Sequence, residues 1–170
     1  MNTTQAIRAR RSIRKYKPGA RIPQEHIDLM LEAAMCAPSA ANKRPCSFIV
    51  VENADTRKKI TEGINGNQFL NDASFAVVIC GDPNSMPNGP KEGFWPQDCA
   101  AATQNLLLQA AELGYGTCWC GIHPGNRTPT ITEVLGIKDV VPVSLIAVGV
   151  PDETPDRRGF YDKSKVRYIR

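Results

Sequence analysis

The chain has 170 residues, a length that favours one domain over two. Hydrophobic residues make up 42% and charged residues 22% of it, which is typical of globular proteins and excludes disordered, collagen-like and small disulfide-stapled classes. The longest apolar runs, residues 75–80 and 143–150, are too short to span a membrane, and the N-terminus lacks the apolar segment of a secretory signal. We expect one cytoplasmic domain covering residues 1–170, with no membrane partner.

The net charge of +4 is unevenly distributed along the chain. Residues 1–21 carry seven basic side chains and no acidic one, residues 157–170 carry a net charge of +5, and the residues between them carry −8. Such asymmetry is typical of a protein with a phosphate-bearing partner, whether a nucleic acid, a membrane or a cofactor. On charge alone, two solvated basic tails are the simpler explanation.

Six cysteines occupy positions 36, 46, 80, 99, 118 and 120, beside the two histidines His26 and His123. No CxxC pair exists and only Cys118 and Cys120 are closely spaced, so the pattern predicts no metal site. Without an export signal, the thiols are expected to be reduced and structural.

The first predicted elements are two helices. One covers residues 3–11 and is capped by a polar residue among positions 2–4. The other begins at Pro23, carries apolar residues at the i, i+3, i+4, i+7 and i+8 positions of one face, and ends before Pro38.

Residues 47–51 and 75–80 are the first two predicted strands, and the second is expected to be buried on both faces because it is continuously apolar. Between them, Asp55 is expected to cap a short helix that ends at residue 64. The stretch 63–71, rich in Gly and Asn, is predicted to be a loop.

A long loop is predicted over residues 81–96, which contain four prolines. Asp98 is then expected to cap a helix that runs to about residue 113 and is closed by Gly114. This helix is apolar on nearly every side, so it must be buried, and a subunit interface is a natural second surface for it. We expect residues 106–108 to lie between subunits.

The last predicted elements are a strand over residues 117–122, a helix and a strand over residues 143–150. The helix is expected to begin with a capping box of Thr130 and Glu133 and to end at Gly136. Helices therefore alternate with strands, which indicates an α+β or α/β protein with a central sheet.

Arg10, Arg11 and Ser12 place two guanidinium groups and a hydroxyl together at the end of the first predicted helix. The forked donors of arginine match phosphate oxygens, and serine adds a further donor. These groups suit a monophosphate dianion, although a solvated basic helix end would have the same sequence.

Two segments of small residues could admit a planar ligand. In residues 37–42, small side chains allow close approach to the backbone, and Ser39 and Asn42 can form directed hydrogen bonds. In residues 113–121, glycines flank a predicted strand, which is typical of a close approach to its backbone. Each segment alone is equally consistent with an ordinary connection.

Four segments in this order resemble the FMN-dependent nitroreductase family. They are RRSIRKY at 10–16, AAMCAPSA at 33–40, AATQNLLL at 101–108 and GYGTCW at 114–119. The ending Gly149-Val150-Pro151, followed by Arg157 and Arg158, is similar to that of the family as well. The resemblance runs over residues 3–168, nearly the whole chain.

The resemblance implies an α+β nitroreductase-like fold, in which helices flank a central, mostly antiparallel sheet. It implies an intertwined homodimer with two FMN molecules at the subunit interface. It also implies an oxidoreductase that passes electrons from NAD(P)H to a nitroaromatic, a quinone or a similar small acceptor in a ping-pong cycle. Since the flavin carries the redox chemistry, we expect no catalytic side chain.

Residue by residue, the resemblance implies that Arg10, Arg11 and Ser12 contact the FMN phosphate and ribityl chain. It places Arg14 at the pyrimidine edge of the flavin, and a backbone N–H of Cys120 or Gly121 near flavin N5. The remaining implied contacts are Pro38, Ser39, Ala40 and Asn42 from the other subunit, Asn67, and Arg157 and Arg158 at the phosphate. Basic side chains from both ends of the chain would then converge on one phosphate.

The chain departs from the family in one segment. Arg44 and Cys46 stand where the family often has Gln and Trp, which reshapes the wall of the pocket and offers a cation to an anionic acceptor or NADPH.

A flavin-binding carrier or sensor with little turnover is an alternative that needs the same contacts. A nucleic-acid module would need interleaved aromatic residues or a known motif, and neither is present.

Overall fold

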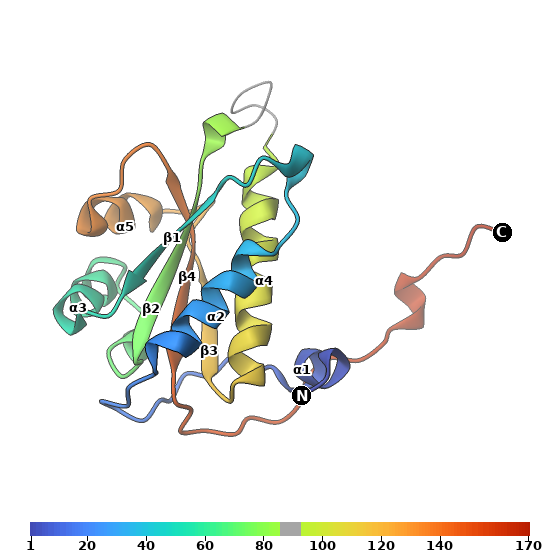
Figure 1. Ribbon diagram of the computed structural model, residues 1–170, viewed down its shortest axis with the longest axis horizontal. Coiled ribbons are helices and arrows are strands. Elements are labelled where there is room, and N and C mark those ends of the chain that lie inside the picture. Colours follow the sequence, from blue (N-terminus) through green and yellow to red (C-terminus); the bar gives the residue numbers. More distant parts are fainter. Residues whose placement is uncertain (86–92) are drawn as a thin grey trace.

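The computed structural model of the protein describes residues 1–85 and 93–170 (Figure 1). Its centre is a four-stranded sheet with the order β1-β2-β4-β3, and each neighbouring pair is antiparallel. The strands are β1 (Cys46–Val51), β2 (Phe75–Gly81), β3 (Gly116–Gly121) and β4 (Val141–Gly149). The predicted α+β class with an antiparallel sheet is confirmed.

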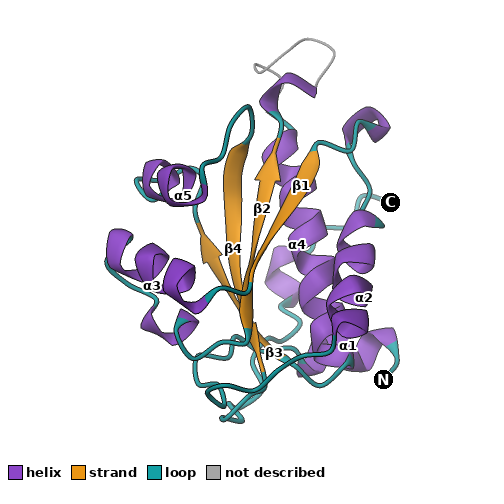
Figure 2. Cartoon of the chain, turned by 60° about the vertical axis from the view of Figure 1, so that its left-hand side comes forward, coloured by secondary structure: helices purple, strands orange, loops and turns teal. Residues whose placement is uncertain are grey.

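Helices cover both faces of the sheet (Figure 2). On one face lie α2 (Gln24–Met35) and α4 (Trp95–Glu112), with the short α1 (Thr3–Ala9) against the C-terminal part of α4. On the other face lie α3 (Ala54–Gly63) and α5 (Thr128–Leu135). No helix in the two described stretches of chain is long and apolar enough to cross a membrane.

The continuous apolar run of β2 supplies both cores, because successive side chains of a strand point to opposite faces. Phe75, Val77 and Ile79 enter the core under α2 and α4, whereas Ala76 and Val78 enter the core under α3 and α5. Every residue of β2 is buried, as predicted for a strand covered on both sides.

The prediction that α4 is buried along most of its surface is only partly confirmed. Leu106 and Leu107 are almost completely buried within the single chain, where they pack in the core under α2 and α4. Leu108 is half-buried and Gln104 is exposed. The sequence could not show that the chain's own sheet covers Leu106 and Leu107, so their burial needs no second copy.

Several helix starts differ from the predictions because a better cap lies nearby. Asn53 caps α3 through a 2.8 Å bond from the backbone N–H of Thr56, whereas Asp55 lies in the first turn. The helix α4 begins at Trp95 with a proline in its first turn, so Asp98 is not its cap.

The capping box predicted from Thr130 and Glu133 is wrong, since α5 begins at Thr128 and Thr130 lies inside it. The prediction that Gly136 closes this helix is confirmed, because it adopts the left-handed conformation that is common where helices end. The long loop predicted over 81–96 instead contains a short 3-10 turn (Pro83–Ser85) and the start of α4, and its residues 86–92 lie outside the described part.

Candidate functional site

The first helix ends at Ala9, two residues earlier than predicted, because the chain then turns to pair with the sheet. Ser12 forms a parallel bridge with Thr117 of β3, and the N–H of Ile13 donates to the Thr117 carbonyl at 2.8 Å. Tyr16 is buried, and its hydroxyl donates to the Ile13 carbonyl at 2.7 Å. Residues 12 and 13 are thus paired with the outer edge of β3, and Tyr16 pairs with Pro151, just beyond β4.

Two glycines that face each other across β3 and β4 make room for this segment. A Cβ at Gly116 would lie 2.9 Å from two carbons of Ile13, and a Cβ at Gly149 would lie 2.7 Å from the ring of Tyr16. The close approach predicted around residues 113–121 is therefore made at Gly116 by the chain itself. Gly121 is different, because nothing lies within 4 Å of the position of its missing Cβ.

Glu153, which follows β4 in the chain, forms hydrogen bonds with residues 14 and 15. Its carboxylate accepts hydrogen bonds from the backbone N–H groups of Arg14 and, at 3.1 Å, Lys15. The N–H of Asp152 donates to the Lys15 carbonyl at 2.9 Å. Nothing near residues 14 and 15 in the sequence could have revealed Glu153, because the contact spans most of the chain.

A cavity of about 230 Å³ opens beside Arg10 and Arg11, between the end of α1, the end of α4 and residues 151–155. We call it the basic cavity. Arg11 lines it and is only partly exposed, and its Nη1 atom is buried without a hydrogen-bond partner. A buried guanidinium nitrogen without a partner is costly unless an acceptor reaches it, so this geometry fits an anion.

Beyond Thr117, no strand in the described part of the chain pairs with the outer edge of β3. Because the Thr117 carbonyl points to this edge and backbone groups alternate along a strand, those of Trp119 and Gly121 point there too. The N–H groups of Cys118 and Cys120 point to β4 instead. Of the two residues predicted to present an N–H to a flavin, Gly121 has the suitable direction and Cys120 does not.

Asn67 follows α3 in a left-handed conformation, with φ of 59°. Its Nδ2 atom is buried and has no hydrogen-bond partner. Three buried side-chain polar atoms without partners are found in the described stretches, and two of them belong to the predicted site residues Arg11 and Asn67. Unpartnered donors are what a binding site presents before an acceptor arrives.

The loop at 38–42 uses its polar side chains internally. The Oγ of Ser39 accepts the N–H of Arg44 at 2.9 Å, and the Oδ1 of Asn42 accepts the Nε–H of Arg44 at 3.2 Å. Ala41, Asn42 and Arg44 all have φ near +50°, a left-handed conformation that costs energy in residues other than glycine. The predicted contacts of Ser39 and Asn42 therefore compete with bonds inside the loop.

This loop is held far from the basic cavity. The N–H of Ala40 donates to Asp98 at 3.0 Å, near the start of α4, whereas Ala111, near its end, lines the basic cavity. Because an α-helix rises about 1.5 Å per residue, Asp98 and Ala111 lie about 20 Å apart along α4. One chain therefore does not bring the loop 38–42 and the arginines 10–14 together.

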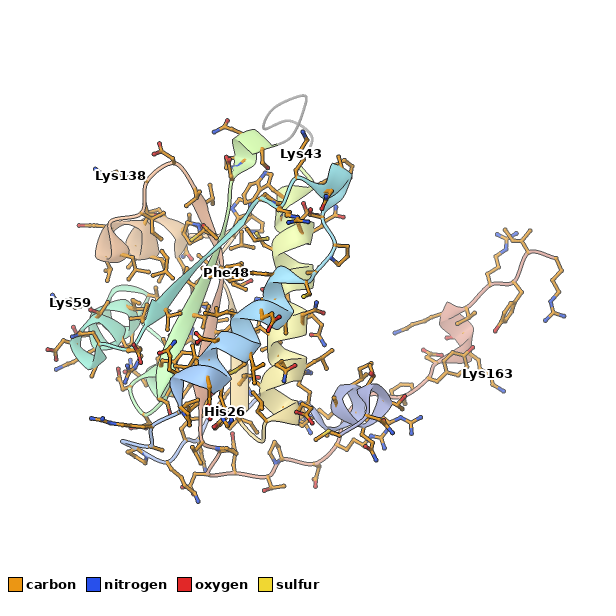
Figure 3. All side chains as sticks on the ribbon, in the orientation of Figure 1. His26, Lys43, Phe48, Lys59, Lys138 and Lys163 are labelled. Atoms are coloured by element: carbon orange, nitrogen blue, oxygen red, sulfur yellow. The ribbon has the colours of Figure 1, made fainter. Side chains whose placement is uncertain are left out.

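A second cavity, of about 470 Å³, lies beside this loop between α2, β1 and α4, and we call it the apolar cavity. Most of its lining residues are aliphatic or aromatic, among them Phe48 of β1 (labelled in Figure 3). Asp98, only 8% exposed, also lines it, and its Oδ2 atom has no partner. Sequence analysis assigned Asp98 to a helix cap and so missed its contact with Ala40.

Arg157 and Arg158 are exposed at the start of a C-terminal arm, residues 156–170. The arm passes α1 and extends away from the sheet, with Lys163 far from the core (Figures 1 and 3). The side-chain hydrogen bonds and ion pair described for the arm are local, such as those of Asp162 with Ser164 and Lys165. Convergence of these arginines on the basic cavity stays a prediction.

Comparison with known proteins gives consistent results. The model of the family described as "Nitroreductase family" matches residues 7–75 and 64–150. A protein of Methanothermobacter thermautotrophicus, provisionally named as an NADH dehydrogenase/NAD(P)H nitroreductase, is 42% identical over 168 residues, which cover 98% of this chain and 86% of that protein.

Solved structures agree with this family match. An FMN-dependent nitroreductase from Clostridium difficile superposes with a TM-score of 0.88 at 28% identity and covers 99% of both chains. A provisionally assigned nitroreductase from Desulfovibrio desulfuricans, solved in complex with FMN, gives a TM-score of 0.83 at 27% identity and covers 100% of this chain and 98% of that one.

Proposed function

The chain belongs to the nitroreductase family, and on this basis we propose that it is an FMN-dependent oxidoreductase that takes its electrons from NAD(P)H. Relatives carry names such as FMN reductase [NAD(P)H] from Bacillus subtilis, at 28% identity, and one related structure contains FMN. The observation in this chain that carries the proposal is Arg11, which lines the basic cavity and has a buried Nη1 atom without a hydrogen-bond partner.

The predicted contact residues would hold different parts of FMN. Arg10 and Arg11, which line the basic cavity, and their chain neighbour Ser12 would bind the phosphate through charge-assisted hydrogen bonds. Gly121 would donate its edge N–H to the ring system, and Asn67 would donate its free Nδ2–H to a ring or ribityl oxygen. Arg14, whose backbone is fixed by Glu153, would place a cation beside the pyrimidine edge.

FMN supplies the hydride and electron transfer in this family of reactions, and the protein supplies position and electrostatic surroundings. In this proposal the Gly121 N–H orients the ring, and the Arg14 cation favours the negative charge that reduction places on the pyrimidine edge. No side-chain acid or base is assigned. We expect a ping-pong cycle with a nitroaromatic, a quinone or a similar small acceptor.

We also propose that two copies build each site as a homodimer. The support is the distance of about 20 Å along α4 between the anchor of the loop 38–42 and the basic cavity, which one chain does not bridge. The arm adds support, because Phe160 and Ile169 are each 88% exposed and lack cover within the chain. In the dimer, Pro38, Ser39, Ala40 and Asn42 of one copy, and Arg157 and Arg158 of the arm, would complete a site.

The whole chain, residues 1–170, would act as one FMN-binding domain, and a cytoplasmic location fits its six unpaired cysteines.

The decisive experiment is the visible spectrum of purified protein supplied with FMN, recorded without oxygen before and after addition of NADH or NADPH. The proposal expects bound flavin that is bleached by one nucleotide and restored by a quinone or nitroaromatic. Bound flavin that neither nucleotide bleaches favours a carrier or sensor, and protein that binds no flavin contradicts both.

The phosphate contacts have their own test. Exchange of Arg10 and Ser12 together for alanine is expected to lose flavin on gel filtration while the circular dichroism spectrum stays unchanged. Unchanged flavin content would place the phosphate elsewhere. Sedimentation of the wild-type protein at low concentration tests the dimer, which a stable monomer would contradict.

A further inference from the structure

Two sulfur atoms meet at the junction of β1 and α4. Cys46 is the first residue of β1, Cys99 lies near the start of α4, and their Sγ atoms are 3.6 Å apart. Cys99 is completely buried, whereas Cys46 is partly exposed and lines the apolar cavity of about 470 Å³. A small solute that enters this cavity therefore reaches one sulfur of the pair and not the other.

The position of Cys99 follows from the absence of a side chain at Gly81. Gly81 is the residue of β2 directly opposite Cys46 in the β1–β2 ladder. A Cβ on Gly81 would lie 2.9 Å from the Cys99 sulfur and 2.6 Å from the ring of Trp95. The Cys99 sulfur thus fills the place over Gly81, and Trp95 packs beside it and keeps it next to Cys46.

The two sulfurs are chemically unequal. The Cys46 thiol and the Cys99 sulfur share a hydrogen bond, with Cys46 as the donor while both are protonated. Once Cys46 is ionised the Cys99 thiol donates to it, and this interaction lowers the pKa of Cys46 and raises the pKa of Cys99. The thiolate is the reactive form of cysteine. Cys46 is therefore the nucleophile of the pair and Cys99 its buried partner.

We propose that Cys46 and Cys99 form a peroxide-reactive dithiol that a hydroperoxide converts into a disulfide. The Cys46 sulfur attacks one oxygen of a hydroperoxide, an S–O bond forms, the O–O bond breaks, and the other oxygen leaves as water or an alcohol after taking up a proton. The Cys99 sulfur then attacks the resulting sulfenic acid, an S–S bond forms, the S–O bond breaks, and water leaves. Two thiols are oxidised by two electrons and one hydroperoxide is reduced.

The geometry requires little movement. A disulfide bond is about 2.0 Å long, so the sulfurs need to approach by about 1.6 Å. The alternative pair, Cys118 and Cys120, is buried and lies two residues apart on β3, where the Cα atoms are about 6.7 Å apart, near the upper limit for a disulfide. Cys80 is buried and its pKa is raised to about 11 by that burial, so it stays protonated.

The bond would fix the loop at its two ends. Asp98, the neighbour of Cys99, already holds the N–H of Ala40, and Cys46 ends the connection that begins there. Oxidation would therefore bond Cys46, the last residue of this connection, covalently to α4. This inference does not depend on the proposed flavin chemistry, because thiols and peroxide are its only reactants.

The test is peptide mapping of the full-length protein treated with a small excess of hydrogen peroxide, blocked with N-ethylmaleimide and digested without reduction. We expect one cross-linked pair of peptides that contains Cys46 and Cys99 and disappears after treatment with dithiothreitol. The C36S variant, which removes an exposed cysteine outside this pair, is the matched control and should give the same cross-link.

The C99A variant separates the two roles. Without its partner, Cys46 should stop at the sulfenic acid and be labelled by dimedone, whereas C46A should leave Cys99 unlabelled. Circular dichroism melting of both variants verifies that each is folded. The proposal is overturned by failure of the Cys46–Cys99 cross-link to form, by preferential linkage of Cys118 to Cys120, or by equal dimedone labelling of folded C46A and C99A. Flavin content does not enter any of these readouts.

Discussion

The basic cavity and the apolar cavity lie toward opposite ends of α4. Each is lined by one charged residue with a buried atom that lacks a hydrogen-bond partner, and the two residues carry opposite charges. Arg11 Nη1 lies beside the C-terminal end of the helix, and Asp98 Oδ2 lies in its first turn. The helix dipole favours a cation at the C-terminus and an anion at the N-terminus, so the same helix stabilises both. The difference indicates that a free anion belongs in the basic cavity and a hydrogen-bond donor in the apolar one.

The largest effect is expected from Arg11→Ala. Hydrogen bonds to charged groups contribute about 1.5–3 kcal/mol, so the dissociation constant of FMN should rise about 10- to 100-fold. The measurement is fluorescence titration of FMN into apoprotein. Lys59→Ala, on the far side of the sheet (Figure 3), removes the same charge and should leave the affinity within about twofold. Equal weakening by both variants would mean that net charge, and not the basic cavity, controls binding.

The packing of residues 10–16 against the sheet gives the next largest effect. Gly116→Ala places a methyl group against Ile13 at 2.9 Å, and such overpacking should lower the free energy of unfolding by about 1–3 kcal/mol. Gly121→Ala places the same methyl group in open space on the same strand and should change the stability far less. Urea denaturation of the two variants measures both values. Equal stability would show that residues 10–16 are not fixed by close packing on β3.

The different success of sequence reasoning at the two cavities has a physical reason. The basic cavity lies beside a local motif, residues 10–12. The hydrogen-bond donors of this motif indicate an anion in any fold. The apolar cavity depends on contacts that no local pattern contains, such as Asp98 with Ala40 and Cys99 over Gly81. Glu153 was missed for the same cause, because its contact with Arg14 joins residues 139 positions apart.

The fold was predictable where apolar patterns are strong and poorly predictable where caps compete. β2 is a continuous apolar run and β4 is an apolar run interrupted by Ser144, and both lie within two residues of their predicted ends. The starts of α3, α4 and α5 were misplaced because more than one polar residue or proline near each start could serve as cap. The burial of Leu106 by its own sheet is a tertiary fact, and helical periodicity alone could not separate it from burial in an interface.

At the apolar end, Asp98→Asn should have a smaller effect than either change at the basic end. The amide oxygen can still accept the N–H of Ala40, so mainly the interaction of the carboxylate with the helix dipole is lost, about 0.3–1 kcal/mol. Asp98→Ala, which leaves that N–H without its partner, should cost about 1–3 kcal/mol. Thermal unfolding of the two variants tests this order. A reversed order would show that the charge of Asp98, and not its bond to Ala40, stabilises this end.

The last expected effect is a dependence of stability on pH, and it concerns Cys118 and Cys120, which lie on β3. The thiol of Cys120 donates a hydrogen bond to the Cys118 carbonyl at 3.9 Å, and the interaction between the two side chains lowers the pKa of Cys118 to about 7 and raises the pKa of Cys120. Because the folded pKa of Cys118 lies below its unfolded value of about 8.5, its thiolate contributes stability that is present above about pH 8.5 and is lost as the pH falls through 7. The raised pKa of Cys120 opposes any further gain at higher pH.

The free energy of unfolding in urea, measured with a reductant between about pH 6.5 and pH 8.5, should therefore rise slightly toward the alkaline end of this range. Cys120→Ala removes the hydrogen bond and should flatten the rise, whereas Cys36→Ala, which removes an exposed thiol elsewhere, should keep it. Arg10 and Arg14 also lower the pKa of Cys118 by their positive charge, so bound phosphate should weaken the effect. A rise that survives in Cys120→Ala would mean that these arginines, and not the second thiol, control the ionisation of Cys118.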